Sequence, residues 1–190
     1  MESQYYRTFI AVPLKVDERF LLARTRLIEA LGEERISWTN PEQYHVTLRF
    51  LGDTELSIVN KIINILPREV RVPKRIMLHT DRLASFGPRK RPRVLWLGFE
   101  ENDFLNLLKL DVDRVLEQCG IPAGDQPFRA HLTLGRVRSL KNLQDYYRSV
   151  EEMAQEFSFS LQFSTLVFFR SILGTGGPAY RALKEIQFLQ

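Results

Sequence analysis

Two short motifs with the same pattern contain the residues best suited to do chemistry. His45 is followed at the second position by Thr47, and His131 is followed in the same way by Thr133. Because an imidazole titrates near pH 6.5, one of the two rings can be neutral and the other protonated near neutral pH. The pair would then provide a general base and a general acid, and the hydroxyls would donate hydrogen bonds to anionic oxygens.

A phosphodiester fits such a site. In-line displacement at phosphorus requires that a water molecule lose a proton on one side and that the leaving oxygen gain one on the opposite side. Threonine hydroxyls without an activating neighbour are expected to bind oxygen atoms rather than to attack phosphorus. A lone His on a strand is more often structural, and duplication alone is an alternative explanation of the repeat. A hydrophobic core, however, gives no general reason to select His twice.

The scarce residue types exclude several other kinds of site. Cys119 is the only cysteine, so the chain alone forms neither an intramolecular disulfide nor a cysteine-based metal centre. No two of the three histidines have the short helical spacing of a zinc protease. We therefore expect no metal and no cofactor. The single cysteine also favours a reducing, cytoplasmic compartment.

The composition is that of a folded globular protein with a moderate positive charge. Of the 190 residues, 44% are hydrophobic and 26% are charged, and the formal net charge is +4. No stretch approaches the roughly 18 consecutive apolar residues of a membrane span, and the polar N-terminus lacks the form of a signal peptide.

The positive charge is concentrated in residues 68–93, where nine basic and two acidic residues give a local charge of +7. We expect the densest part of this segment, residues 89–93, to attract an anionic backbone, with ordinary solvated surface as the alternative.

The elements that must position the two motifs occur in a repeated order. Apolar periodicity and turn residues predict a strand over 8–14, a helix over 17–31 with Gly32 as C-cap, and a strand over 44–51. A helix capped by Asp53 or Thr54 and stopped at Pro67 follows. The remaining expected elements are strands over 76–86 and 93–99, a helix over 103–119 ended by Gly120, a strand over 130–137, a helix over 140–157, and strands over 159–173 and 180–189.

This order predicts an α+β fold of two lobes related by a pseudo-twofold axis, each with a mostly antiparallel sheet and flanking helices. The internal duplication would cover approximately residues 33–100 and 121–190 of one bilobal domain spanning residues 1–190. No Pro/Ser-rich linker separates the halves, so independent domains are not expected. Because residues i and i+2 of a strand face the same side, each His shares a face with its Thr.

The paired motifs resemble those of the 2H phosphoesterases, which are named for paired His-x-Thr motifs. The resemblance is strongest to the RNA 2′,3′-cyclic phosphodiesterase branch, historically called 2′-5′ RNA ligases. It extends over nearly the whole chain, through residues 7–12, 44–53, 93–98, 127–137 and 177–180. One departure is Ala130, where the family often has Pro, which should alter backbone stiffness more than chemistry.

The resemblance implies an active site in the cleft between the lobes, no metal, and hydrolysis of terminal RNA 2′,3′-cyclic phosphates to 2′-phosphates. By motif position, His45 and His131 would be the acid/base pair, and Thr47 and Thr133 would bind the phosphate. We expect His45 to protonate the departing O3′ and His131 to activate water, and the sequence also permits the reverse assignment.

Three further residues are candidates around this site. Arg136 occupies the position of the family's phosphate-binding arginine, but strict alternation puts it on the wrong face unless a bulge or strand end follows Gly135. By strict alternation along the strand, Arg49 lies on the same face as His45 and Thr47. The alternative is that Arg49 is an exposed edge residue without a role in the site. Phe9 is a candidate for stacking on a base, with a core phenylalanine as the alternative.

Two other functions fit the same residues. A non-catalytic RNA-end binding protein would use them only to hold phosphate. A 2′-5′ oligonucleotide phosphodiesterase or weak RNA ligase would share every motif, because ligation reverses the same phosphoryl chemistry. The expected partner is an RNA or oligonucleotide with a 2′,3′-cyclic phosphate end, with no membrane and no obligate protein partner. Trp38 and Trp96 are expected to pack in the core or between lobes, and His79 and Cys119 to be structural.

Overall fold

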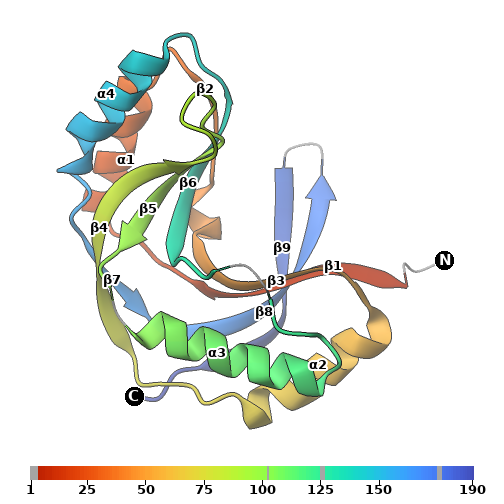
Figure 1. Cartoon of the computed structure of the whole chain (residues 1–190). Coiled ribbons are helices and arrows are strands. Elements are labelled where there is room, and N and C mark those ends of the chain that lie inside the picture. Colours follow the sequence, from red (N-terminus) through yellow and green to blue (C-terminus); the bar gives the residue numbers. More distant parts are fainter. Residues whose placement is uncertain (1–3, 102, 125–126, 175–176) are drawn as a thin grey trace.

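The computed structural model describes residues 4–101, 103–124, 127–174 and 177–190. Strands and helices are interleaved along the chain (Figure 1). In chain order they are β1 (Tyr5–Pro13), α1 (Glu18–Ala30), β2 (Arg35–Trp38), the 3-10 turn η1 (Pro41–Gln43), β3 (His45–Glu55), α2 (Leu56–Glu69), β4 (Ile76–Phe86), β5 (Val94–Phe99), α3 (Asp103–Gln118), β6 (His131–Ser139), α4 (Leu143–Ala154), β7 (Ser160–Phe163), β8 (Thr165–Gly174) and β9 (Gly177–Gln187).

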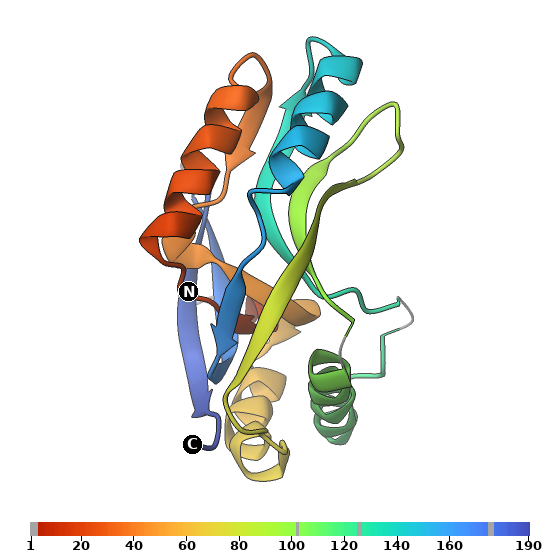
Figure 2. The ribbon, with the colours of Figure 1, turned by 90° about the vertical axis from the view of Figure 1, so that its left-hand side faces the viewer.

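The strands form one curled sheet in the order β7-β4-β5-β6-β3-β1-β8-β9. Strand β2 also pairs with β6, along a part of β6 that does not pair with β3. Strands β3 and β6 meet at a single antiparallel register pair. The sheet therefore divides there into two lobes. Helices α1 and α4 lie together over one lobe, and α2 and α3 lie together over the other (Figures 1 and 2). The expected bilobal α+β fold is confirmed.

Each lobe takes strands from both halves of the sequence. The β4–β5 hairpin, which precedes β6 in the chain, pairs with β6 through β5. The β8–β9 hairpin, which follows β6, instead pairs with β1 and lies on the β3 side of the sheet. The internal duplication of residues 33–100 and 121–190 stays a prediction. In this topology the two repeats would exchange their hairpins between lobes.

Burial at the centre of the sheet follows the alternation of the two motifs. Val46, Leu48, Leu132 and Leu134 are at most 3% exposed and belong to the hydrophobic core. Since alternate residues of a strand point to opposite faces, burial of these four aliphatic side chains sends the His and Thr side chains to the other face. The hydrophobic core thus determines which face of the sheet carries the histidines and threonines of the two motifs.

The predicted start and stop of α2 are both wrong. Strand β3 runs on to Glu55, so neither Asp53 nor Thr54 caps the helix. The Thr54 hydroxyl instead donates to the carbonyl of Gly52 and lies 2.7 Å from the hydroxyl of Thr8 on β1, so both buried hydroxyls have hydrogen-bond partners. Pro67 lies inside the last turn of the helix, which ends two residues later at Glu69.

The predicted strand over residues 159–173 is two strands with different partners. Strand β7 pairs with β4 in one lobe and β8 pairs with β1 in the other, so the chain changes lobes between Phe163 and Thr165. Of the two glycines predicted to end helices, Gly120 has a φ of +91° after α3. Gly32 is not in the left-handed region, and Leu31 is the C-cap of α1.

Candidate active site

The two His-x-Thr motifs lie side by side where the lobes meet. Val46 and Leu132, the middle residues of the two motifs, are antiparallel partners on β3 and β6. This register places each motif histidine opposite the threonine of the other motif. Directly opposite residues have Cβ atoms about 4.5–5.5 Å apart, and diagonal neighbours, such as the two histidines here, about 7–8 Å. Two imidazoles and two hydroxyls therefore surround one small space.

Both histidine rings are held in the same tautomer by the backbone. Nδ1 of His45 lies 2.7 Å from the carbonyl oxygen of Gln43, and Nδ1 of His131 lies 2.8 Å from that of Arg129. Because a carbonyl oxygen only accepts, Nδ1 carries the proton in each neutral ring. Nε2 is then the atom of each ring that is available to take or give a proton.

The carbonyl that orients His45 belongs to the 3-10 turn η1. The side chain of Asn40 caps this turn by accepting a hydrogen bond from the N–H of Glu42. The Gln43 side chain donates to the carbonyl of Pro178 on β9, 3.1 Å away. Contacts to two different segments therefore fix the residue that holds the His45 ring.

Aromatic side chains from neighbouring strands pack against the ring of each motif histidine. The ring of His45 lies 5.1 Å from that of Phe9 and 5.3 Å from that of Tyr180. The ring of His131 lies 4.8 Å from that of Phe86 and 6.1 Å from that of Trp96. Packing of this kind restricts ring rotation and keeps each Nε2 in place.

The surroundings lower the pKa of both histidines below 6.5. Burial disfavours the charged imidazolium and is the main cause for each ring. The nearby positive charges of His131 and Arg136 lower the pKa of His45 further, and those of Arg129 and Arg136 lower the pKa of His131. The unliganded site therefore favours neutral rings, as a general base requires.

A β-bulge brings Arg136 to the face of the motif histidines. Thr133 pairs with Trp96 and Gly135 pairs with Leu95, so Leu134 has no partner on β5. One extra residue reverses the alternation, and Arg136 lines the same cleft as the two motifs. The bulge lies one residue before the predicted place. A Cβ on Gly135 would lie 2.7 Å from Cγ2 of Ile36 on β2, so this close approach favours glycine.

The corresponding bulge in β3 overturns the interpretation of Arg49. Ile10 pairs with Arg49 and Ala11 with Thr47, which leaves Leu48 without a partner on β1. Arg49 is thereby turned away from the cleft toward α3. Its guanidinium lies 3.8 Å from the carboxylate of Asp113 and donates to the carbonyl of Pro122. It is neither a cleft residue nor an exposed edge residue.

Phe9 does not present a face to a base. Its side chain is 3% exposed, because it packs against His45 on one side and against Phe169 and Tyr180, each 5.0 Å away between ring centroids. Base stacking by Phe9 is therefore wrong, and the alternative of a core phenylalanine is what the structure contains. Its contact with the ring makes it a positioning residue for His45.

The side chains around the motifs enclose a cleft of about 670 Å³. Its described lining contains two arginines, Arg136 and Arg138, and no Asp or Glu. In the part of the chain that the structure describes, the hydroxyls of Thr47 and Thr133 and the guanidinium of Arg136 have no hydrogen-bond partner. These donors, together with the missing carboxylates, make the cleft suited to an anion. The lining residues are Ser37, Trp38, Thr39, Asn40, Gln43, His45, Thr47, Phe50, His131, Thr133, Arg136, Arg138, Gly177, Pro178 and Tyr180.

Several of these cleft residues were missed by the sequence analysis. Trp38, expected only in packing, also lines the cleft, and Trp96 is buried behind His131 as expected of a packing residue. Phe50 stands five residues after His45, the same offset that separates Arg136 from His131. That equal offset is the signal that could have identified it.

The basic segment 68–93 is not one surface. Strand β4 lies between its two basic ends and spans 11 residues, roughly 35 Å of extended chain. One end follows α2, and the other is the β4–β5 loop at the opposite end of the strand (Figure 1). The loop continues directly into β5, where Val94 pairs with Arg136 of the cleft. Only residues 89–93 therefore adjoin the site.

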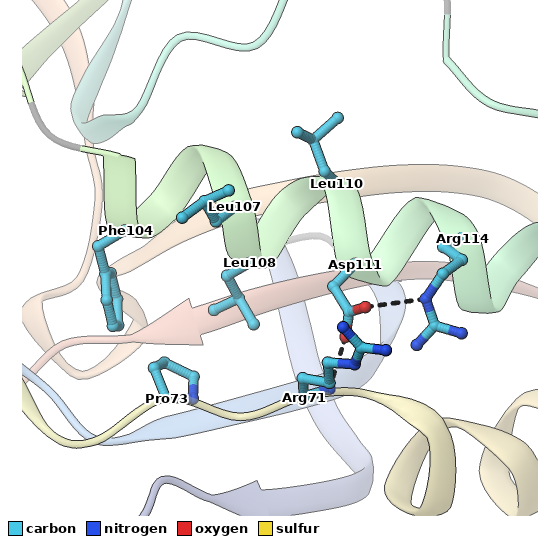
Figure 3. A pocket seen from close by; sticks show the side chains of 8 residues that line it. All are labelled: Arg71, Pro73, Phe104, Leu107, Leu108, Leu110, Asp111 and Arg114. Atoms are coloured by element: carbon cyan, nitrogen blue, oxygen red, sulfur yellow. Dashed lines mark hydrogen bonds and ion pairs between the residues drawn. The ribbon is translucent and has the colours of Figure 1, made fainter.

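A second groove, of about 390 Å³, lies between α3 and the segment that follows α2 (Figure 3). Its wall is mostly apolar, with Phe104, Leu107 and Leu108. The one carboxylate there, Asp111, accepts hydrogen bonds from the N–H of Arg71 and from Nε of Arg114. The described lining of this groove includes neither motif and no histidine.

Within residues 4–101, 103–124, 127–174 and 177–190, no three His, Cys, Asp or Glu side chains are grouped so that they could hold a metal ion. None of the described helices combines the length and apolar character needed to cross a bilayer.

Comparison with known proteins places this geometry in a family. The model of the family LigT like Phosphoesterase matches residues 10–96 and 99–180, which include both motifs. The RNA 2′,3′-cyclic phosphodiesterase of Aquifex aeolicus is 34% identical over 158 residues, which cover 78% of this chain and 79% of that protein. The protein of the same name from Thermotoga maritima is 29% identical over 188 residues, 96% of this chain and 95% of its own.

Solved structures share the fold over almost the whole chain. A crystal structure of E. coli LigT with 3′-AMP aligns with a TM-score of 0.71 at 19% identity, over 98% of this chain and 99% of that chain. Another phosphoesterase aligns with a TM-score of 0.73, also at 19% identity and over 98% of this chain and 99% of its own. With its two motifs, its bilobal fold and the family match, the chain belongs to the LigT-like phosphoesterases of the 2H group.

Proposed function

We propose that this protein hydrolyses terminal 2′,3′-cyclic phosphates of RNA to 2′-phosphates without a metal ion, using His45 and His131 as the acid/base pair. The observation that carries the proposal is the pairing of Val46 with Leu132, which sets two uniformly oriented imidazoles and two hydroxyls around one space. The names of the Aquifex aeolicus and Thermotoga maritima relatives support the same reaction.

In the proposed reaction, Nε2 of neutral His131 takes a proton from water as the water oxygen attacks phosphorus. The bond between phosphorus and O3′ breaks on the opposite side, and protonated His45 gives its proton to the departing O3′. Atoms and charges balance, and the product has a 2′-phosphate and a free 3′-hydroxyl. A later proton exchange with solvent restores the starting forms of both rings.

Three further cleft residues, Thr47, Thr133 and Arg136, are assigned to binding of the phosphate group. The hydroxyls of Thr47 and Thr133 donate hydrogen bonds to the non-bridging oxygens, and Arg136 supplies a full positive charge near them. Charge on these oxygens persists through the displacement, so fixed donors stabilise it without rearrangement. The described lining of the cleft supplies no carboxylate cluster for a metal ion, and the proposed proton transfers by the histidines do not require a metal.

The test is incubation of the protein with a nucleoside 2′,3′-cyclic phosphate in excess EDTA, with the 2′- and 3′-phosphate products separated by chromatography. We expect complete conversion to the 2′-phosphate. A 3′-phosphate product would overturn the assigned direction of cleavage, and a need for added metal would overturn metal independence. Tight, salt-sensitive binding of the 2′-phosphate with no turnover would identify a non-catalytic RNA-end binding protein instead.

The same site also suits formation of a 2′-5′ linkage. Joining a 5′-hydroxyl to a 2′,3′-cyclic phosphate uses the same two proton transfers with the same roles: His131 takes the proton of the attacking 5′-hydroxyl, and His45 gives its proton to the departing O3′. The cleft favours hydrolysis because water at its bulk concentration competes with any dilute 5′-hydroxyl. Incubation with an added oligonucleotide that carries a 5′-hydroxyl measures the ratio of the two outcomes, and we expect hydrolysis to dominate.

A further inference from the structure

The solvent side of α3 carries a stripe of residues that the proposed reaction does not use. Asp103, Leu107, Leu110 and Arg114 follow one another at intervals of four, three and four residues. At 3.6 residues per turn, this spacing keeps them within about 60° of one another around the helix axis. The two leucines of this α3 stripe are 63% and 60% exposed, whereas Leu108, between them in the sequence, is buried in the core. Helix α3 therefore presents one apolar face to the core and a second, narrower one to solvent.

The groove between α3 and the segment that follows α2 borders this stripe (Figure 3). Leu107, Leu110 and Arg114 belong to its lining, and Phe104 and Pro73 add apolar surface to its wall. Exposed leucines beside an apolar groove cost hydrophobic free energy in water, and a partner that covers them with its own apolar side chains recovers that free energy. The α3 stripe and the groove together therefore have the apolar surface of a binding face.

The two ends of the α3 stripe carry opposite charges. Asp103 is exposed in the first turn of the helix. At the other end, Arg114 donates from Nε to Asp111 and from Nη2 to the carbonyl of Glu69, and further N–H groups of its guanidinium remain to bind another carboxylate. The exposed Arg71 adds a second positive charge at this end of the groove. A matching partner therefore carries a cation at one end, an anion at the other and apolar side chains between them.

A second copy of α3 that runs in the opposite direction has this pattern. If a twofold axis passes between residues 108 and 109, Asp103 of each copy faces Arg114 of the other, and Leu107 of each faces Leu110 of the other. The antiparallel arrangement also brings opposite ends of the two helix dipoles together. The next residue at this spacing, Glu117, extends past the first residue of the opposite helix and has no helical residue facing it. A wholly acidic or wholly basic peptide, in contrast, would meet a like charge at one end of the stripe.

We propose that the α3 stripe is the interface of a reversible homodimer, in which two chains pack their α3 helices antiparallel about Leu107 and Leu110. The described linings of the groove and of the cleft share no residue, so this interface is separate from the two motifs and does not depend on the proposed function. A contact between single helices is at the small end of interface sizes, where complexes are weak. The expected dissociation constant is therefore about 1 µM to 1 mM.

Sedimentation equilibrium of the full chain at increasing concentration tests the dimer. We expect the mass of the wild type to rise from that of the 22.3 kDa monomer toward twice that value. Leu110→Asp places a charge inside the apolar contact and should raise the dissociation constant about tenfold or more. Leu22→Asp is the matched control, because Leu22 is 55% exposed on α1 over the other lobe, and it should dimerise like the wild type. A wild type that stays monomeric at about 1 mM, or equal losses in the two variants, would overturn the proposal.

Exchange of the charges tests the antiparallel pairing itself. Asp103→Lys alone and Arg114→Glu alone each set like charges opposite each other at both ends of the interface, so each should raise the dissociation constant about tenfold or more.

An equimolar mixture of the two variants restores opposite charges at both ends, because each variant complements the other. Heterodimers should therefore form at least about tenfold more tightly than either variant associates with itself. The double variant Asp103→Lys/Arg114→Glu should likewise associate with itself again. Circular dichroism checks that every variant is folded. Wild-type association in both single variants, or a mixture that sediments as the average of the two, would overturn the antiparallel α3 interface.

Discussion

Arg136 lies in the same cleft as His45 although the two residues come from strands of different lobes, and its positive charge lowers the pKa of the His45 imidazole. It acts in the same direction on His131. A single cation, placed by a bulge in β6, thus lowers the pKa of both proposed catalytic groups.

The pH dependence of catalysis follows from these shifts. A general base is active when neutral and a general acid when protonated, so kcat/KM should be bell-shaped. Because the pKa values of both histidines lie below 6.5 in the free protein, we expect the centre of the bell below pH 6.5. A bound phosphate offsets the charge of Arg136, so the profile of kcat should lie at higher pH than that of kcat/KM. Identical profiles, or a kcat/KM centre above pH 7, would contradict this account.

Replacement of Arg136 tests the coupling directly. In Arg136→Gln the two histidines lose a nearby positive charge, so their pKa values rise and the kcat/KM profile moves to higher pH. KM should also rise by about tenfold, as expected for loss of a hydrogen bond to a charged group. Arg138→Gln is the control, since Arg138 lines the same cleft but is not among the charges that lower the two pKa values. A shift of equal size in both variants would refute the specific role of Arg136.

Asp113 is expected to contribute to stability through a mostly buried ion pair network. Its carboxylate lies 3.8 Å from the Arg49 guanidinium and 2.5 Å from the Lys109 ammonium, and its side chain is 8% exposed. Asp113→Ala should lower the free energy of unfolding by about 3 kcal/mol, because it leaves two poorly solvated cations without their carboxylate. Urea denaturation measures this change.

Glu156→Ala is the matched control for that measurement. The pair of Glu156 with Arg26 is solvent-exposed, with side-chain exposures of 37% and 55%. Its loss should cost about 0–1 kcal/mol. If both substitutions cost the same, the Asp113 network adds nothing beyond an ordinary surface pair.

The β4–β5 loop should matter only for longer substrates. Arg89, Lys90 and Arg91 are exposed and are not among the residues that line the cleft. The triple change Arg89→Gln, Lys90→Gln and Arg91→Gln should lower kcat/KM for an oligonucleotide with a 2′,3′-cyclic phosphate end by about tenfold at low salt, and less at high salt. Activity on a mononucleoside cyclic phosphate should not change.

The equivalent change at the other end of β4, Arg68→Gln, Lys74→Gln and Arg75→Gln, removes the same charge far from the cleft. It should leave both substrates unaffected. Equal losses in the two triple variants would mean that net charge, and not the position of the loop, attracts the substrate.

Much of the site could be predicted from the sequence because it depends on local alternation. The residues of each His-x-Thr motif share one face of a strand, and the aliphatic residues between and after them pack in the core. Two such motifs in a repeated order of elements were enough to predict a two-lobed α+β fold and a paired site.

The bulges could not be predicted in the same way, because they depend on the register of neighbouring strands rather than on local periodicity. In β3 the bulge at Leu48 exchanges the faces on which Arg49 and Phe50 lie. Strict alternation from His45 therefore predicted Arg49, and not Phe50, on the face of the cleft. In β6 the bulge that Arg136 requires lies at Leu134. Phe9 was left as a candidate for base stacking, beside the alternative of a core phenylalanine, for a related reason: its contacts with Phe169 and Tyr180 join residues far apart in the sequence.

The most direct test of the central claim is the activity of His45→Ala, His131→Ala and the double variant on a nucleoside 2′,3′-cyclic phosphate in EDTA, with folding checked by circular dichroism. If the two imidazoles act as acid and base in one step, each single change should lower kcat by about 10²–10⁴-fold. The double variant should then be little worse than either single variant, because residues that act as a unit are not additive. Wild-type turnover in either single variant would contradict the account.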